Sequence, residues 1–327
     1  MQLLRFHPLL KRNRWGGRRL ATVLEKPIGP EPDYGESWEI ADHGDDQSLV
    51  DGGPFDGWSL AQLVTEHAKE LLGRHADRTQ FPLLVKFLDA HDRLSLQVHP
   101  NDALAREFDV TENGKSEAWI VIDTAPDSRL FAGLKASVTP EGFKRHLAAG
   151  TVADCLHVIP AKPGDCIYIP AGTVHAIGEG ILLAEVQQSS DLTFRLHDWD
   201  WLDDNGKPRE LHVENSLLCT DWDRGPVDPV TPVPVADSSH YASSHTVEQL
   251  VACEHFVIQR HRASTPFPIP AEDRFRILMA LEGTATLRCD QQTVPLPRGG
   301  TVLIPAAAEG VEVDPTEAVV LLETFLS

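Results

Sequence analysis

Cysteine and basic residues are scarce in this chain of 327 residues. The first shortage argues against certain structural sites, and the second argues against certain binding partners. Its five cysteines are odd in number and show no CxxC spacing, so the sequence predicts neither a disulfide framework nor a thiolate zinc site. Only 29 Lys and Arg stand against 49 Asp and Glu, which gives a formal net charge of −20. Nucleic acids and anionic membranes bind basic faces, so neither is an expected partner.

No apolar run reaches the length of a membrane span. The segment Met1–Arg19 holds six Lys or Arg but lacks the continuous apolar core of a signal peptide. Together with the cysteine usage, this predicts a cytoplasmic protein. Charge alone leaves an organelle transit peptide open as the alternative.

Turn-forming residues, in contrast, are plentiful: 24 Pro and 23 Gly accompany a hydrophobic share of 42%, which favours a folded, mainly β protein. Two short helices are predicted as insertions. One covers 60–73, where apolar residues recur at helical spacing and Gly73 ends the pattern; the other runs from Thr139, as cap, to Ala149. Segments of strand character, bounded by turn residues, are 81–88, 94–99, 117–122, 156–159, 166–169, 181–187, 193–197, 255–261, 275–281, 284–289 and 301–304.

A cluster of prolines and acidic residues from Asp221 to Ser239 predicts a linker between two β units. We therefore expect a catalytic domain over 1–225, a linker over 226–240 and a second domain over 241–327. The second domain contains a weak internal repeat, because 299–306 echoes 164–171 at an offset of 135 residues. At that offset the position equivalent to His175 is occupied by Gly310, so the second domain is expected to lack metal ligands.

Metal-competent side chains gather in three segments of the first domain: 94–102, 114–119 and 169–175. In a strand, successive side chains point to opposite faces, so Gln97 and His99 look the same way while Leu96 and Val98 pack behind them. Taken singly, each such residue has an ordinary structural explanation. A lone histidine is more often a core or surface residue, and Glu117 could simply pair with Lys115.

In these segments the chain resembles the zinc-dependent mannose-6-phosphate isomerases, the type I phosphomannose isomerase family of the cupin superfamily, in its shorter bacterial form. The matching motifs follow the family order over roughly two thirds of the chain, which is more specific than one short motif. They are Trp15–Gly17, Gly35–Glu39, Leu94–Asp102, Gly114–Trp119, Ile169–His175 and Gln187–Arg195. One departure is Trp201, where many members have an arginine.

The resemblance implies two cupin-like, jelly-roll β-barrels and one Zn²⁺ per chain. Its ligands would be Gln97, His99, Glu117 and His175, a set that leaves room for water or substrate, as catalytic zinc sites do. Mixed nitrogen and oxygen ligands also suit iron, cobalt or manganese, so the metal stays open. The substrate would be a sugar phosphate, D-mannose 6-phosphate interconverting with D-fructose 6-phosphate through a cis-enediol. Monomer and homodimer both remain open.

By the same resemblance, Arg195, Lys115 and Glu185 are the candidate catalytic residues, and Ser95, Lys115 and Arg195 the candidate substrate-binding residues. Arg195 carries a permanent charge that suits an enediolate or phosphate, and Lys115 suits charge stabilisation or proton transfer. Each has a structural alternative. Arg195 could pair with Asp191 or Asp198, Glu185 could be a buried carboxylate paired with Lys115 or Arg195, and serine is common in strands.

Two other functions compete, because cupin folds host many chemistries. An iron oxygenase usually has two histidines and one carboxylate with open positions, and Gln97 as an extra ligand fits that pattern poorly. A non-catalytic sugar-binding cupin would need neither Lys115 nor Arg195 near a metal. A third possibility is a metal-dependent isomerase that acts on another sugar phosphate.

Overall fold

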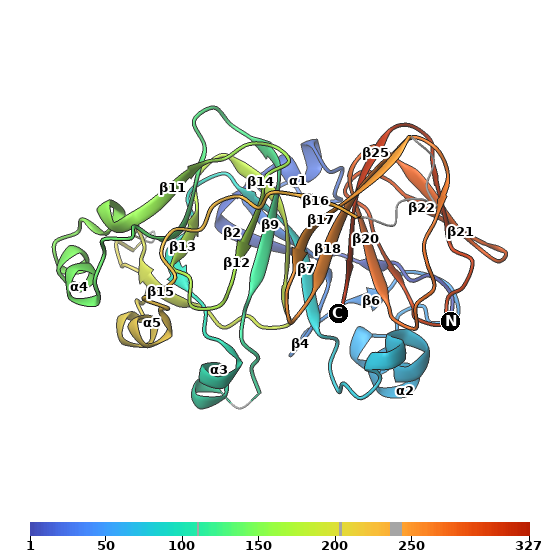
Figure 1. The fold of residues 1–327 in the computed structure, drawn as a ribbon, viewed down its shortest axis with the longest axis horizontal. Coiled ribbons are helices and arrows are strands. Elements are labelled where there is room, and N and C mark those ends of the chain that lie inside the picture. The colour runs from blue at the N-terminus through green and yellow to red at the C-terminus, as the bar shows by residue number, and fades with distance from the viewer. Residues whose placement is uncertain (110, 203–204, 236–243) are drawn as a thin grey trace.

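The computed structural model describes residues 1–109, 111–202, 205–235 and 244–327 (Figure 1). Antiparallel strands make up most of it, and short helices lie around them, so the mainly β prediction is confirmed. The helices are α1 (Arg19–Thr22), α2 (Leu60–Leu72), α3 (Asp102–Phe108), α4 (Pro140–Ala148) and α5 (Val213–Cys219), with 3₁₀ turns at Gly73–His75 and Val152–Cys155. None of the described helices is long and apolar enough to cross a membrane.

The larger sheets form two lobes (Figure 1). In the first lobe, one sheet has the order β11 (Leu156–Pro160), β10 (Arg129–Leu134), β13 (His175–Ile177), β8 (Leu96–Val98) and β15 (Phe194–His197). The other has β12 (Cys166–Ile169), β9 (Glu117–Thr124), β14 (Ile181–Gln188), β7 (Leu83–Ala90), β3 (Tyr34–Ile40) and β2 (Leu9–Gly17). Small pairs join β1 (Phe6–His7) to β6 (Leu49–Val50), and β4 (Asp42–His43) to β5 (Asp46–Gln47).

The second lobe also has two sheets. The first has the order β16 (Val233–Pro234), β17 (His245–Ala252), β18 (Val257–Ala263), β25 (Val319–Phe325), β20 (Arg276–Glu282) and β23 (Thr301–Ile304). The second has β19 (Phe267–Pro268), β24 (Glu312–Pro315), β21 (Ala285–Cys289) and β22 (Gln292–Leu296). The arrangement is compatible with the two cupin-like barrels that the resemblance implies.

Both predicted helices form, because local signals specify them. In α2 the Ser59 hydroxyl accepts from the Gln62 N–H at 3.1 Å while the Gln62 side chain accepts from Ser59 N–H at 2.9 Å, a capping box. Gly73 ends this helix with φ of 62°, and an added Cβ would lie 2.3 Å from the Asp273 carbonyl oxygen, so only glycine fits there. In α4 the Thr139 hydroxyl accepts from Gly142 N–H at 3.1 Å.

The two lobes share a hydrophobic cluster, in which the rings of Phe81 and Phe275 lie 4.7 Å apart. Leu4, at the start of the chain, pairs with Leu303 of β23. In the linker region the Val230 N–H donates to the Cys166 carbonyl oxygen at 2.7 Å, so this stretch lies along β12. The division into 1–225, 226–240 and 241–327 stays a prediction, and residues 236–240 of that linker lie outside the described residues.

A buried charge network inside the second lobe gives a prediction on stability. His261 Nε2 lies 2.8 Å from Glu323 Oε2, and Arg276 forms an ion pair with the same carboxylate. Burial by itself would raise the pKa of Glu323, but His261 and Arg276 outweigh it and lower that pKa to about 2, from 4.5. Because the folded-state pKa is the lower one, the stabilisation is complete above about pH 4.5 and is lost as the pH falls toward 2.

We therefore expect Glu323→Gln to reduce the free energy of unfolding at pH 7 by about 3 kcal/mol, and by much less at pH 3. Urea unfolding at both pH values measures this, with Glu282→Gln as the matched control, because Glu282 is an exposed glutamate at the end of β20, the strand that carries Arg276. An equal loss at both pH values would contradict the electrostatic explanation.

Candidate metal centre and active site

Strand register brings the predicted metal ligands together. In the first sheet β8 lies between β13 and β15, and Gln97 pairs with His175 on one side and with Arg195 on the other. His99 follows β8 immediately. Glu117 begins β9 in the facing sheet, where it pairs with Ile169 and Gln187. Residues from three distant segments therefore meet between the two sheets of the first lobe.

His99, Glu117 and His175 form a buried cluster whose ligand-type atoms all lie within 4.8 Å of one another. Glu117 Oε2 is 3.5 Å from His99 Nε2, and Glu117 Oε1 is 3.4 Å from His175 Nε2. The Gln97 side-chain amide reaches His175 Nε2 at 3.3 Å. Among the residues that the structure describes, this is the one group of three or more such side chains with the spacing of a metal site.

Backbone carbonyls orient both imidazoles. The Nδ1–H of His99 donates to the Leu192 carbonyl oxygen at 3.0 Å, and that of His175 donates to Thr173 O at 2.8 Å. Each ring therefore carries its proton on Nδ1 and turns an unprotonated Nε2 toward Glu117, the arrangement typical of metal-binding histidines. Glu117 Oε1 is buried without a hydrogen-bond donor. These features fit a divalent cation.

Burial and neighbouring charges hold the cluster in the protonation state that a cation requires. Burial, and then the Lys115 ammonium, lower the pKa of His99 to about 3, and burial also lowers the pKa of His175. Burial alone would raise the pKa of Glu117, but Lys115 and the histidines keep it well below its usual range. At neutral pH the site thus has two neutral imidazoles and a carboxylate.

Lys115 lies beside this cluster. Its Nζ donates to Glu117 Oε2 at 2.6 Å and to His99 Nε2 at 3.1 Å, and its side chain is 5% exposed. The simple pairing of Glu117 with Lys115 is therefore present, but the carboxylate also faces both histidines. The ion pair and the metal-type cluster share one carboxylate.

Glu185 has a different partner from those expected. Its Oε1 lies 3.1 Å from Lys86 Nζ, and its Oε2 accepts from Trp119 Nε1 at 2.9 Å. The alternative that paired it with Lys115 or Arg195 is wrong, because Glu185 and Lys86 face each other in the β14–β7 register. Burial, and then Glu117, raise the pKa of Glu185. Lys86 also contacts Glu36, 3.4 Å away.

Arg195 does not form the surface ion pair that was its structural alternative. Its Nη1 donates to the Glu210 carbonyl oxygen at 2.9 Å, and its buried Nε has no hydrogen-bond partner among the described residues. Asp198 pairs with Arg14 and Arg209 instead. The Arg195 guanidinium therefore keeps hydrogen-bonding capacity for a ligand.

A cavity of about 340 Å³ connects these groups. Of the predicted residues, Ser95, Gln97, Lys115, Glu185 and Arg195 line it, whereas His99, Glu117 and His175 lie behind the wall. Ser95 Oγ is 3.5 Å from Gln97 Oε1, so Ser95 is on the metal side of the cavity. The structure thus brings every predicted site residue to this cavity or the cluster beside it.

Comparisons with known proteins agree with this geometry. Residues 3–120 match the model of the phosphomannose isomerase type I catalytic domain, and 246–321 match the mannose-6-phosphate isomerase cupin domain. The mannose-6-phosphate isomerase ManA of Bacillus subtilis (strain 168) is 35% identical over 305 residues, 92% of each chain. The chain belongs to the type I mannose-6-phosphate isomerase family.

Other relatives of this isomerase family agree. The mannose-6-phosphate isomerase of Streptococcus mutans is 43% identical over 203 residues, which is 62% of this chain and 63% of that protein. The crystal structure of the mannose 6-phosphate isomerase from Bacillus subtilis superimposes with a TM-score of 0.90 at 29% identity, covering 99% of both chains.

Two cavity residues that the isomerase motifs did not single out also line the site. Lys86 comes from β7 and Arg209 from the segment after β15. Lys86 lies eight residues before Leu94, where the metal motif begins, and a lone lysine within the otherwise apolar predicted strand 81–88 is the signal that could have revealed it. Arg209 has no comparable local signal.

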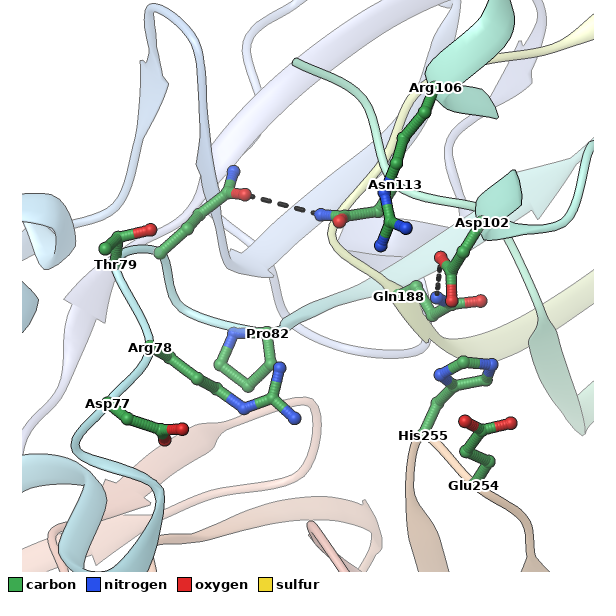
Figure 2. Close-up of a pocket in the computed structure, with 11 residues that line it drawn as sticks. Asp77, Arg78, Thr79, Pro82, Asp102, Arg106, Asn113, Gln188, Glu254 and His255 are labelled. Atoms are coloured by element: carbon green, nitrogen blue, oxygen red, sulfur yellow. Dashed lines mark hydrogen bonds between the residues drawn. The ribbon is translucent and has the colours of Figure 1, made fainter. Parts of the chain in front are cut away.

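A second pocket, of about 400 Å³, has Asp102, Asn113 and Gln188 among its lining residues (Figure 2). Figure 2 shows the side chains of Asp102 and Gln188 facing each other there, joined by a 3.0 Å hydrogen bond. Asp102 also accepts from Gly114 N–H, and Gln188 accepts from Ser116 N–H, both at 2.8 Å. These bonds hold the backbone on either side of Lys115 and so help to position the Lys115 side chain.

Proposed function

We propose that the protein is a zinc-dependent aldose–ketose isomerase that interconverts D-mannose 6-phosphate and D-fructose 6-phosphate through a cis-enediol. The observation that carries this proposal is the buried His99–Glu117–His175 cluster behind a cavity lined by cationic side chains. An anionic sugar needs such a local basic site, because the chain as a whole carries a formal charge of −20.

Zinc is the metal that we propose for the cluster. His99, His175 and Glu117 would hold it, with the Gln97 amide as the fourth ligand once its oxygen faces inward; the two ends of an amide are exchanged by a half-turn. When bound, the ion supplies Lewis-acid polarisation of the sugar's C1 and C2 oxygens and stabilises negative charge.

The chain's own residues would do the rest. Arg195, fixed by its bond to Glu210, would stabilise the negative charge that develops on the enediol oxygens. Lys115 would bind the same region of the substrate, and Ser95 would donate a hydrogen bond to it. Glu185 is the candidate proton carrier between C1 and C2, because its raised pKa brings it closer to the range in which general bases act. Lys86 would orient the Glu185 carboxylate.

Mannose 6-phosphate isomerisation, coupled to detection of fructose 6-phosphate, tests this function. We expect activity to fall by at least about 10³-fold on chelation, the effect of several kcal/mol of lost metal stabilisation, and to return on addition of zinc. If iron, cobalt or manganese restored activity and zinc did not, zinc would be the wrong metal in this proposal. No activity in a folded, zinc-loaded protein would favour another sugar phosphate or a non-catalytic sugar-binding role.

A further inference from the structure

Two arginines converge on one carboxylate just after the end of β15, and a third arginine lies nearby. Arg209 donates to Asp198 through Nε at 2.7 Å and through Nη2 at 2.5 Å, and Arg14 Nη2 lies 3.0 Å from Asp198 Oδ1. Asp198 is 5% exposed. Arg195 lies three residues before it on the same segment. Arg14 comes from β2, so two distant parts of the first lobe meet here.

Trp201 holds two of these arginines in place. The Cζ of Arg14 lies 4.1 Å from the Trp201 ring centroid, and the Cζ of Arg209 lies 5.6 Å from it, so both guanidiniums interact with one indole. The indole is uncharged, but its ring interacts favourably with the guanidiniums of Arg14 and Arg209, which come from other parts of the sequence.

The guanidiniums of Arg14, Arg195 and Arg209 lie close enough to repel one another. Burial, and then the charge of Arg209, lower the pKa of Arg195, and burial lowers the pKa of Arg14. Arg14 and Arg209 share the Asp198 carboxylate, and Asp92 and Glu210 are the other acidic neighbours of this group. An anion bound beside the three guanidiniums would reduce this repulsion.

Arg209 is placed to meet that anion. It lines the cavity together with Arg195, whereas Arg14 does not. Asp198 takes its Nε and Nη2, and no hydrogen bond of Nη1 to a described residue is found. Asp198 thus fixes one edge of the guanidinium and leaves a terminal nitrogen for a ligand. A planar, oriented guanidinium is well suited to phosphate oxygens.

The substrate's chemistry selects the group that would bind there. In a 6-phosphorylated sugar, the phosphate is at the opposite end of the molecule from C1 and C2. Arg195 pairs with Gln97 in the strand ladder and so lies beside the metal cluster, but Asp198 comes after the last paired residue of β15, His197. We propose that Arg209 binds the substrate's phosphate group, and that Asp198, Trp201 and Arg14 position its guanidinium. This inference rests on the proposed function.

The test compares wild type with Arg209→Ala and Arg209→Lys, all loaded with metal. Arg12→Ala is the matched control, since Arg12 makes a similar two-point contact with Asp33, at 2.7 and 3.0 Å, outside the cavity. The probe is D-mannitol 6-phosphate, which has no carbonyl group and cannot isomerise. Calorimetry measures its Kd, and the coupled assay measures kcat and KM for mannose 6-phosphate.

We expect Arg209→Ala to raise both the Kd and the KM by about 10- to 100-fold while kcat changes less than about threefold, the pattern of lost uniform binding. Arg209→Lys should fall between Arg209→Ala and wild type, and Arg12→Ala should match wild type. An unchanged Kd in either folded Arg209 variant overturns the inference, as does a fall in kcat with KM unchanged. Wild type that binds the probe without isomerising mannose 6-phosphate contradicts the proposed function alone, and the Kd comparison still decides the role of Arg209.

Discussion

Replacing His175 with Ala is expected to remove the bound metal and to lower kcat by about 10³-fold or more, because several kcal/mol of metal stabilisation would be lost with it. His175 is fully buried, and its Nε2 lies between the Glu117 carboxylate and the Gln97 amide. Alanine leaves one imidazole, one carboxylate and one amide, a set too small for a stable four-coordinate site. Metal analysis by plasma emission and the coupled isomerase assay measure the two effects.

The matched control is His157→Ala. His157 belongs to β11 in the same sheet, and its ring bonds to Asp228 at 2.8 Å on the partly exposed side. The same change of side chain there should leave metal content and kcat as in wild type. A folded His175→Ala protein that retained one equivalent of metal would contradict the assigned ligand set and direct attention to the other side chains of the cavity.

The parts of the fold that could be predicted from the sequence are those set by local chemistry. The helix α2 follows from its apolar spacing and Gly73, and α4 follows from Thr139. The ligand candidates came from family motifs, and each motif marks one short segment. The pairing of Gln97 with both His175 and Arg195 joins segments about 80 to 100 residues apart, and only the completed sheet defines it.

The same reason explains what the sequence did not reveal. Glu185 pairs with Lys86 because β14 and β7 are neighbours in register, although 99 residues separate them in the sequence. Lys115 and Arg195 were the alternative partners for Glu185, but Lys115 pairs with Glu117, two residues away. Ion pairs that cross strands depend on the order of strands in the sheet, which periodicity within one strand does not specify.

Arg195→Ala is the second change with a large expected effect, and it should separate catalysis from metal binding. We expect kcat to fall by about 10²- to 10³-fold, the size seen when one group that stabilises developing negative charge is removed. Bound metal should stay at the wild-type level, because the Arg195 side chain donates to the Glu210 carbonyl oxygen, and among the described residues it has no hydrogen bond to a side chain of the metal cluster. Arg195→Lys, which keeps the charge but loses the planar guanidinium, should recover part of the activity.

Arg195→Ala and Arg209→Ala are expected to change different kinetic constants. Both guanidiniums line one cavity, but Arg195 is in register with Gln97 beside the metal cluster, whereas Arg209 is held by Asp198, which follows the last paired residue of β15. Removing an arginine that stabilises a charge formed only in the transition state should mainly lower kcat. Removing an arginine that binds the phosphate, which is charged throughout the reaction, should mainly raise KM. If Arg195→Ala raised KM alone, the two arginines would share phosphate binding, and Lys115 would become the remaining candidate for stabilising the enediol. Near wild-type turnover with intact metal would remove Arg195 from the chemistry altogether.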